Sequence, residues 1–328
     1  MSLVATTVTQ GELEPALEQH RRELMGYCYR MLGSPFEAED AVQETMLRAW
    51  RGADKLGARG ALRSWLYRIA TNVCMDALSA RKRRARPMDL GPAQEPVESN
   101  LNELPEVTWI EPIPDSMVAA EDPAERAVAR ETLRLAFVAA LQHLPPRQRA
   151  VLILAEVLRW KAAEVAELLD TSVASVNSAL QRARATLDSA AISSTDSIPE
   201  MDEDQRELLS RYVEAFEAYD IDALTSVIRE DAIQSMPPYD MWLSGRDDVF
   251  AWWMGPGIGC KDSRVLPAPQ ANGTVAFGQY KPSESGSGHD PWALQVLEVS
   301  ADGIAELTFF LDTERLFPLF GLPPRLDP

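Results

Sequence analysis

A proline-rich, acidic segment interrupts the helical pattern of this 328-residue chain. Residues 87–122 contain six prolines and no steady hydrophobic period, which is typical of a flexible linker. A single domain usually takes about 100–200 residues, so we expect separate compact units on the two sides of this segment. We place the linker itself at residues 88–122, after a first module over 1–87 and before a second module over 123–190.

The charge is divided in the same way. The formal net charge of the chain is −18 at pH 7, yet residues 21–86 carry a net +7 and residues 129–187 a net +3. The acidic excess lies in residues 87–128, with −9, and residues 188–328, with −16. Attraction to phosphate is screened beyond roughly 8–10 Å, so a basic module can bind nucleic acid although a distant domain is acidic.

Membrane, metal and disulfide proteins fit this sequence poorly. It has no run of about 18 apolar residues and no basic start followed by an apolar core, so we expect a cytoplasmic protein without a membrane segment. Cys28, Cys74 and Cys260 are far apart and form no Cys/His cluster. We therefore expect reduced thiols, no metal site and no bound cofactor.

The first module reads as all helical. One helix is predicted over residues 36–51 and a second over 61–83, each with apolar residues at helical spacing on one face. The second module carries a short helix over 162–169, a turn at Asp170-Thr171, and a longer helix over 172–187. This is a helix-turn-helix pattern, with Thr171 or Ser172 as the N-cap of the longer helix.

The last part of the chain changes character after a short linker at residues 191–203. Helices are predicted over 204–219, 222–228 and 247–254, and a hairpin is predicted over 292–311 with its turn at 302–303. Helices followed by an antiparallel sheet indicate an α+β domain over residues 204–328. The fold class is therefore multidomain, with two all-α modules before one α+β domain.

The two modules resemble parts of a known family. Region 2 of an extracytoplasmic-function sigma factor, in group IV of the sigma-70 family, is similar to the stretches SPFEAEDAVQETMLRAWR and LRSWLYRIATNVCMDALSARKRR. Region 4 is similar to LPPRQRAVLILAEVLRWKAAEVAELLDTSVASVNSALQRARATL. The stretches DAIQSMPPYDMWLSGRDDVFAWW and FGLPPRL are similar to the cone-shaped, SnoaL-like (NTF2-type) domain of some extended sigma factors.

The resemblance implies a promoter-specificity subunit that joins core RNA polymerase, binds promoter DNA and catalyses nothing itself. Its contacts would include the β′ clamp helices, the β flap, and the −10 and −35 promoter elements. For the clamp helices it implies Asp40, Gln43, Glu44 and Arg48. For the −10 element it implies Arg63, Tyr67, Arg68, Asn72, Asp76, Arg81, Lys82 and Arg83. For the −35 element it implies Ser172, Ser175, Asn177, Ser178, Gln181, Arg182 and Arg184.

Residue chemistry agrees with these roles, although a solvated helix face would look similar. Aromatic rings, guanidinium planes and phosphate clamps are what an opened duplex requires, and the start of a recognition helix reaches base edges in the major groove. Asn and Gln pair with adenine, whereas Ser discriminates less. Many relatives carry Lys or Arg where this chain has Asn177 and Ala179, so we expect a weaker hold on the −35 phosphates.

The α+β domain leaves three interpretations open. Large side chains could enclose a pocket for a small-molecule ligand: Met236, Tyr239, Trp242, Trp252, Trp253, Phe277 and Trp292. An isomerase or hydrolase would need an acid/base pair, for which Asp231, Asp240, His289 and Asp290 are the candidates. The third interpretation is that the acidic domain modulates the basic modules in cis. For the whole chain, a LuxR-like helix-turn-helix activator is the remaining alternative.

Overall fold

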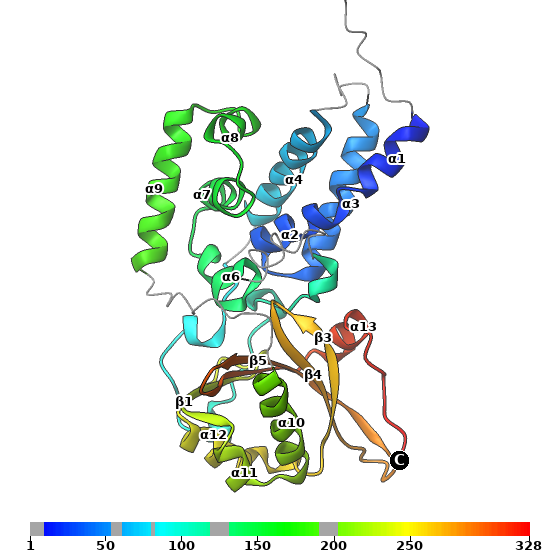
Figure 1. The fold of residues 1–328 in the computed structure, drawn as a ribbon, viewed down its shortest axis with the longest axis vertical. Coiled ribbons are helices and arrows are strands. Elements are labelled where there is room, and N and C mark those ends of the chain that lie inside the picture. Colours follow the sequence, from blue (N-terminus) through cyan, green and yellow to red (C-terminus); the bar gives the residue numbers. More distant parts are fainter. Residues whose placement is uncertain (1–9, 54–60, 80–82, 119–130, 190–202) are drawn as a thin grey trace, which may run out of the picture. The chain divides into compact units, whose positions relative to one another are not determined.

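The computed structural model describes residues 10–53, 61–79, 83–118, 131–189 and 203–328 (Figure 1). The chain forms two compact units, one of residues Met1–Arg84 with Ser116–Ser193, the other of Ala85–Asp115 with Ser194–Pro328. The first unit therefore contains both helical modules, and the second contains the α+β domain together with most of the predicted linker. Among the described helices, none has the length and apolar character needed to cross a membrane.

The first module consists of four helices. They are α1 (Gln10–Glu18), α2 (Arg21–Leu32), α3 (Pro35–Arg51) and α4 (Leu62–Ser79). Gly33 ends α2 with a φ of 75°, a left-handed conformation that suits glycine, and Ser34 then caps α3 by accepting a hydrogen bond from the Glu37 amide. The apolar face expected on α3 is buried, which packs α3 against α2 and α4.

The centre of the first module is aromatic and contains two thiols. Tyr27 and Tyr67 are fully buried, with their rings in edge contact at 5.2 Å between centroids. Cys28 and Cys74, which are distant in the sequence, share a hydrogen bond in this core and remain free thiols. The helix predicted to reach residue 83 ends at Ser79, and residues 80–82, including Arg81 and Lys82, lie outside the described residues.

The second module contains the predicted helix-turn-helix. Its elements are α6 (Leu135–Gln142), α7 (Pro146–Leu152), a π-helical turn (Ile153–Val157), α8 (Ala162–Leu168) and α9 (Val173–Ser189). Ser172 is the N-cap, because its Oγ accepts a hydrogen bond from the Ser175 amide at 3.2 Å. Helical spacing places Val173 on the same side of α9 as the buried Val176 and Ala183, yet Val173 is 43% exposed, whereas Ala179 is buried. Ala179 therefore belongs to the core side of α9 and not to its DNA-facing side.

The second unit is built on a six-stranded sheet in the order β2-β1-β6-β5-β4-β3. The β1–β6 pair is parallel and all other neighbours are antiparallel. The elements are α10 (Glu203–Ala218), α11 (Ile221–Thr225), β1 (Ile228–Ser235), β2 (Trp242–Ser244), α12 (Arg246–Met254), β3 (Arg264–Ala271), β4 (Thr274–Pro282), β5 (His289–Ser300), β6 (Gly303–Phe310) and α13 (Thr313–Leu319). This is the α+β architecture expected from the sequence.

Strand β4 is buried on both faces. On one face Val275 and Phe277 join a core that includes residues of α10 and α12. On the other face the Tyr280 ring makes an edge contact with Phe317 of α13, at 5.1 Å between ring centroids. The chain end continues along this second face, where Leu326 exchanges two backbone hydrogen bonds of 2.9 Å with His289. The C-terminal tail thus closes the outer side of its own domain.

Residues 85–115, called the connecting segment below, are ordered on the α+β domain, in contrast to the flexible linker predicted there. Ala85 pairs with Trp109 and exchanges backbone hydrogen bonds with residues 108 and 110, so residues 86–108 form a closed loop. Within the loop, the Leu104 amide donates to the Pro238 carbonyl at 3.0 Å. Prolines remove backbone donors, and of the remaining amides Gln94 and Leu104 donate to carbonyls of the domain, while others donate to carbonyls within the segment.

A tight turn of the sheet fixes the end of the connecting segment. Asn272 and Gly273, between β3 and β4, both have positive φ, as a two-residue hairpin turn requires. The Ile113 amide donates to the Asn272 side chain at 2.9 Å, and the Asn272 amide donates to the Ile113 carbonyl at 3.1 Å. Residues 119–122 of the predicted linker and most of the 191–203 linker lie outside the described residues.

Candidate nucleic-acid interface

The outer face of α9 is open along its whole predicted row. All seven residues expected at the −35 element are exposed: Ser172, Ser175, Asn177, Ser178, Gln181, Arg182 and Arg184. The opposite side packs on α7 and α8, with Val176 and Ala183 fully buried. Arg184 forms an ion pair with Glu156, which partly neutralises it. The helix therefore presents amide, hydroxyl and guanidinium groups to solvent from a fixed position.

The outer face of α3 carries the residues expected to bind polymerase. Asp40, Gln43 and Arg48 are exposed and Glu44 is partly exposed. Arg48 forms ion pairs with Glu44 on its own helix, at 2.6 Å, and with Asp76 of α4, at 3.6 Å. Asp76, expected at the −10 element, thus lies beside the polymerase row.

Sequence reasoning missed two apolar residues on α3. Leu47 is 42% exposed and Trp50 is 38% exposed, although both are large apolar side chains. Leu47 follows Gln43 by four positions, so it continues the polar row on the same helical face. Exposed aromatic and aliphatic side chains beside charges are typical of protein interfaces. Apolar residues outside the buried stripe were the signal that could have identified them.

Residues expected at the −10 element share α4 but differ in accessibility. Arg63, Arg68, Asn72 and Asp76 are exposed, whereas Tyr67 is fully buried. The Tyr67 hydroxyl donates to Glu23 at 3.3 Å, and Arg63 donates to the same carboxylate oxygen at 2.9 Å. Burial raises the pKa of Tyr67, so its phenol stays protonated. In this conformation Tyr67 cannot stack on a base.

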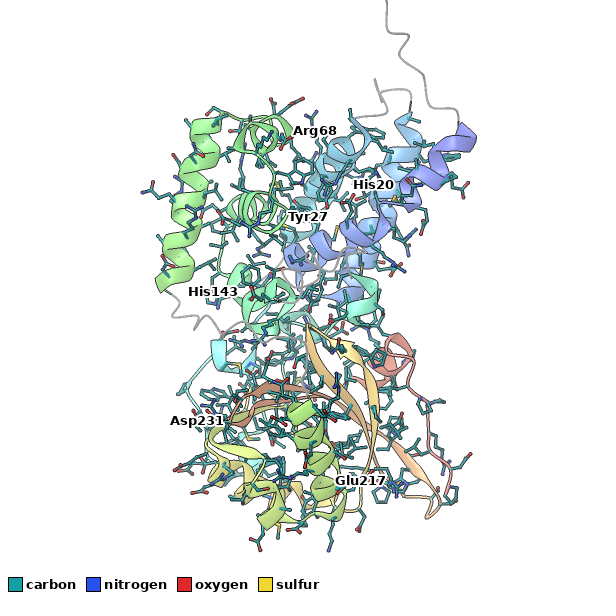
Figure 2. All side chains as sticks on the ribbon, in the orientation of Figure 1. His20, Tyr27, Arg68, His143, Glu217 and Asp231 are labelled. Atoms are coloured by element: carbon teal, nitrogen blue, oxygen red, sulfur yellow. The ribbon has the colours of Figure 1, made fainter. Side chains whose placement is uncertain are left out.

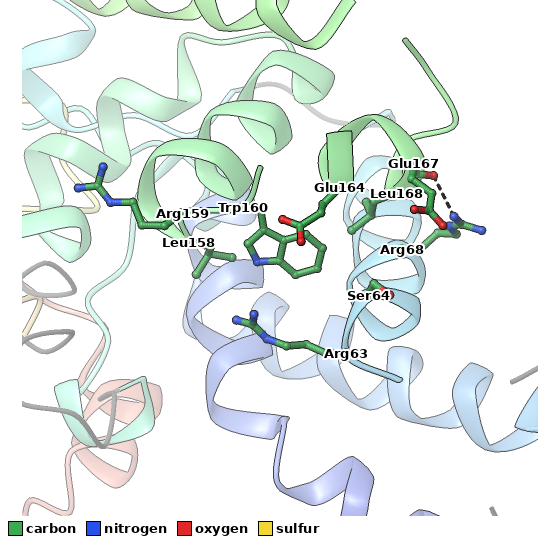
Figure 3. A pocket seen from close by; sticks show the side chains of 9 residues that line it. All are labelled: Arg63, Ser64, Arg68, Leu158, Arg159, Trp160, Glu164, Glu167 and Leu168. Carbon is green, nitrogen blue, oxygen red and sulfur yellow. Dashed lines mark hydrogen bonds between the residues drawn. The ribbon is translucent and has the colours of Figure 1, made fainter. Parts of the chain in front are cut away.

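The second module covers this part of α4. Trp160, in the turn between α7 and α8, meets Tyr67 edge-on with 5.1 Å between ring centroids, and the Arg63 guanidinium lies over the indole at 5.3 Å (Figure 3). The Arg68 guanidinium donates to the Glu167 carbonyl at 2.9 Å. These contacts border an open cavity of about 420 Å³, with α4 on one side and α8 on the other. Sequence analysis assigned no role to Trp160.

Two buried guanidinium groups join the modules beneath this cavity. Arg149 of α7 donates to the Met31 carbonyl at the end of α2, and also to the carbonyls of Gln142 and Leu144 at 3.1 and 3.2 Å. Arg30 of α2 donates to the Thr132 carbonyl at 3.1 Å and to its hydroxyl at 2.8 Å. Burial lowers the pKa of both arginines to about 10, so they remain charged at neutral pH.

The described part of the basic run after α4 also faces the second module. Arg83 lies 2.8 Å from the ring nitrogen Nδ1 of His143, a residue at the end of α6 (Figure 2). The next residue, Arg84, is buried and forms a 2.7 Å ion pair with Glu37 of α3. Of the predicted −10 residues, Arg63, Tyr67, Arg68 and Arg83 therefore all have a partner within the first unit.

The α+β domain holds a small aromatic cavity of about 20 Å³, enough for one water molecule. Four of the predicted pocket residues line it: Met236, Trp252, Trp253 and Trp292. Phe277 lies in the surrounding core, and Tyr239 and Trp242 instead contact the connecting segment, where the Trp242 indole donates to the Gly91 carbonyl at 2.9 Å.

The four acid/base candidates of this domain lie apart from the cavity. Asp231 is exposed on β1 and pairs with Arg229 at 2.7 Å, which lowers the pKa of its carboxyl (Figure 2). Asp240 accepts a hydrogen bond from Asn102 of the connecting segment at 2.9 Å. His289 pairs with the tail, and Asp290 lies 3.6 Å from Arg325 of the tail. None of the four lines the cavity.

Comparison with known proteins identifies both helical modules. Residues 16–84 match the family model for sigma-70 region 2, and residues 134–187 match the model for sigma-70 region 4. The chain is similar to the ECF RNA polymerase sigma factor SigG of Mycobacterium tuberculosis, with 46% identity over 321 residues that span 97% of this chain and 85% of the relative.

Two further similarities concern SigJ of the same organism. The ECF RNA polymerase sigma factor SigJ of Mycobacterium tuberculosis is 32% identical over 217 residues, or 66% of this chain and 61% of SigJ. The crystal structure of SigJ aligns over 94% of this chain and 98% of its own, with a TM-score of 0.59 and 23% identity, a similarity of fold. On the 46% identity to SigG across nearly its whole length, this chain belongs to the family of ECF RNA polymerase sigma factors.

Proposed function

We propose that the chain binds core RNA polymerase and directs promoter recognition, DNA melting and transcription initiation. In this proposal the outer face of α3 binds polymerase, α4 and the basic run after it bind the −10 element, and α9 binds the −35 element. The observation that carries the proposal is the outer row of α9, whose seven polar residues are all exposed on a capped helix-turn-helix. Family membership supports the same function.

Run-off transcription with reconstituted core polymerase tests this function. Templates would be drawn from upstream regions of the source genome, and the full chain should produce discrete transcripts that core polymerase alone does not. Replacing Asn177 and Gln181 together by alanine should weaken these transcripts, because both amides can pair with adenine. Thr186→Ala, on the same helix but outside the row, is the matched control. DNA binding that is independent of polymerase, without any transcript, would favour the LuxR-like activator.

We also propose that the α+β domain modulates the sigma modules in cis, through the connecting segment. Two sets of charge contacts support this: in one the arginine belongs to the domain, and in the other it belongs to the segment. Arg315 of the domain pairs with Glu106 and with Glu111 of the segment. In return Arg86 of the segment is attracted by the carboxylates of the cross-strand partners Glu306 and Glu298, which raise its pKa against the effect of burial together with Asp89 of the segment itself.

Docking of the segment shortens the chain available between the modules. The closed loop of residues 86–108 removes about 80 Å from the greatest span of a fully extended linker. A linker held in this way limits how far the second module can move from the first. Promoter elements lie a fixed distance apart along DNA, so the reach between the two modules affects which promoters can be bound.

A charge reversal on the domain tests this modulation in the full-length chain. Arg315→Glu should repel Glu106 and Glu111, release the segment, and change the yield of run-off transcription. Arg325→Glu, which alters the pair between Arg325 of the tail and Asp290 of β5, is the control and should leave transcription unchanged. Equal yields from wild type and Arg315→Glu would reject the modulation while leaving the sigma-factor function in place. We further infer that the domain acts without catalysis, since its acid/base candidates lie apart from its cavity.

A further inference from the structure

Trp160 lies in a setting that resembles a binding site for a nucleic-acid base. Its indole contacts the Tyr67 ring, and the Arg63 guanidinium lies 5.3 Å from the centroid of Trp160 and 5.5 Å from that of Tyr67. Proteins that bind single strands hold unstacked bases between aromatic rings and arginine planes. An indole has the same fused six- and five-membered ring outline as a purine. Trp160 therefore fills the space that a purine would take beside Arg63 and Tyr67.

The cavity around Trp160 has separate basic and acidic walls. Arg63, Ser64 and Arg68 approach it from α4, whereas Glu164 and Glu167 approach it from α8 and Arg159 from the turn before α8 (Figure 3). Guanidinium and hydroxyl groups suit a sugar-phosphate backbone, and carboxylates repel it. A DNA strand is therefore excluded while α8 stays in place, and the α4 wall becomes a basic surface once α8 moves away.

We infer that Arg63 and Tyr67 form a site for one unstacked base of the promoter strand, and that Trp160 occupies this site in the chain without DNA. The inference rests on the proposed sigma-factor function, and it adds a named base site and an internal competitor for it. Opening of the two modules withdraws Trp160 and Glu164 together. The same movement exposes Tyr67, which is fully buried in the present conformation.

The contact is suited to reversible opening. The Trp160 indole nitrogen is buried without a hydrogen-bond partner among the described residues, so the edge contact with Tyr67 and the cation–π attraction of Arg63 hold the ring without an N–H bond. A buried donor without a partner disfavours the closed state, because that donor would bind water after opening. The Arg68 contact is a single hydrogen bond to a backbone carbonyl at an exposed position. DNA therefore competes with a contact of moderate strength.

Strand binding by the full-length chain without polymerase tests the inference. The probe is a fluorescein-labelled DNA single strand of about 12 nucleotides with randomised sequence, and the readout is anisotropy. Trp160→Ala should bind it about tenfold more tightly than wild type, since the ring and cation–π contacts that compete with DNA are lost. Val157→Ala, in the preceding π-helical turn and outside the cavity wall, should bind like wild type. Equal affinities of Trp160→Ala and wild type would overturn the inference.

A crosslink keeps the test decisive if Trp160→Ala fails to fold. Ser64→Cys and Glu164→Cys, combined with Cys260→Ser, place one thiol on each wall of the cavity for a cleavable bismaleimide. The crosslinked chain should lose strand binding and regain it after cleavage; retained binding in the crosslinked form would overturn the inference. Because these assays omit polymerase, absence of run-off transcription from every form would reject the proposed function while leaving the strand-binding result to decide the base site.

Discussion

Helices α9 and α4 belong to the same compact unit, yet their DNA-facing sides are in different states. The seven residues of the α9 row are exposed, and among the described residues only Arg184 of this row has an ion pair outside its own helix. On α4, Tyr67 is buried and Arg63 and Arg68 contact residues of the second module. The −35 surface is thus complete within its own module, whereas the −10 surface depends on how the two modules are arranged.

This difference in exposure between α9 and α4 matches the difference between recognising a DNA duplex and opening its strands. A recognition helix reads a duplex from outside, so it needs only an exposed and rigid face. Strand opening requires a surface that holds unstacked bases, and such a surface is aromatic and basic. An aromatic surface left exposed in the free chain would be an apolar patch, and the second module covers it instead. The contact between the modules is therefore where a change in sequence should have the largest effect.

Arg149→Ala should have the largest effect on the contact between the two modules, and therefore on the difference in exposure between α4 and α9. It removes the donor that satisfies carbonyls of Met31, Gln142 and Leu144, so we expect the first unit to lose about 3 kcal/mol of unfolding free energy. Urea unfolding, with hydrogen exchange of the α2 and α7 amides, measures this loss. Arg147→Ala removes only an exposed hydrogen bond to the Leu169 carbonyl and should cost under about 1 kcal/mol. Equal losses would show that Arg149 does not join the modules.

Asn177→Ala should weaken promoter binding without any loss of stability. An amide paired with one base contributes about 1–3 kcal/mol of discrimination, so we expect about a tenfold weaker holoenzyme complex at a promoter with adenine at that position. The unfolding free energy should stay within about 0.5 kcal/mol of wild type, because the side chain is exposed. A stability loss that matches the binding loss would place Asn177 in the packing of α9.

Arg182→Ala should lower the salt dependence of promoter binding. Each phosphate contact contributes about 0.9 to the slope of log affinity against log salt, so the slope should fall by about that amount for all promoters alike. Arg184→Ala should change the slope less, since Glu156 already neutralises part of its charge. Titrations at several salt concentrations measure both slopes, and a larger change for Arg184 would reverse the assignment of the two residues.

Glu23→Gln should test the comparison of α4 with α9 through the stability of the protein at acid pH. Burial alone raises the pKa of Glu23, but hydrogen bonds and charges from His20 and Arg63 outweigh it and lower the pKa below its ordinary 4.5. A carboxyl whose pKa is lower in the folded chain stabilises the fold at pH values above its pKa in the unfolded chain. This stability is lost as the pH falls through the pKa of the folded chain. Wild type should therefore lose stability at the α2–α4 contact below about pH 4.5, and Glu23→Gln should lose less.

The same unfolding measurements across about pH 3–6 provide the check, with hydrogen exchange of α4 and α9 read separately. The α4 amides should respond to Glu23→Gln, and the α9 amides should not, because the partners of Glu23 in the described part of the chain all belong to the first module. An identical pH profile for both proteins would show that the Glu23 carboxyl does not support α4.

Local sequence pattern was sufficient for α3, the helix-turn-helix, α10, α12, the β5–β6 hairpin and the outer row of α9. Apolar residues at helical spacing, Ser34 and Ser172 as caps, and the Asp302-Gly303 turn specify elements through neighbours a few positions apart. For α9, helix period alone separates the buried side from the exposed side. The exceptions are Val173, which is exposed, and Ala179, which is buried.

Tertiary structure decided what covers α4 and where the connecting segment lies. Arg68 and the Glu167 carbonyl are 99 positions apart in the chain, and Asn102 and Asp240 are 138 apart. No local period records which side chain meets which across such separations. Proline content predicted a segment without helices, but whether it stays in water or docks depends on partners for its backbone groups, and those partners belong to a domain folded more than a hundred residues later.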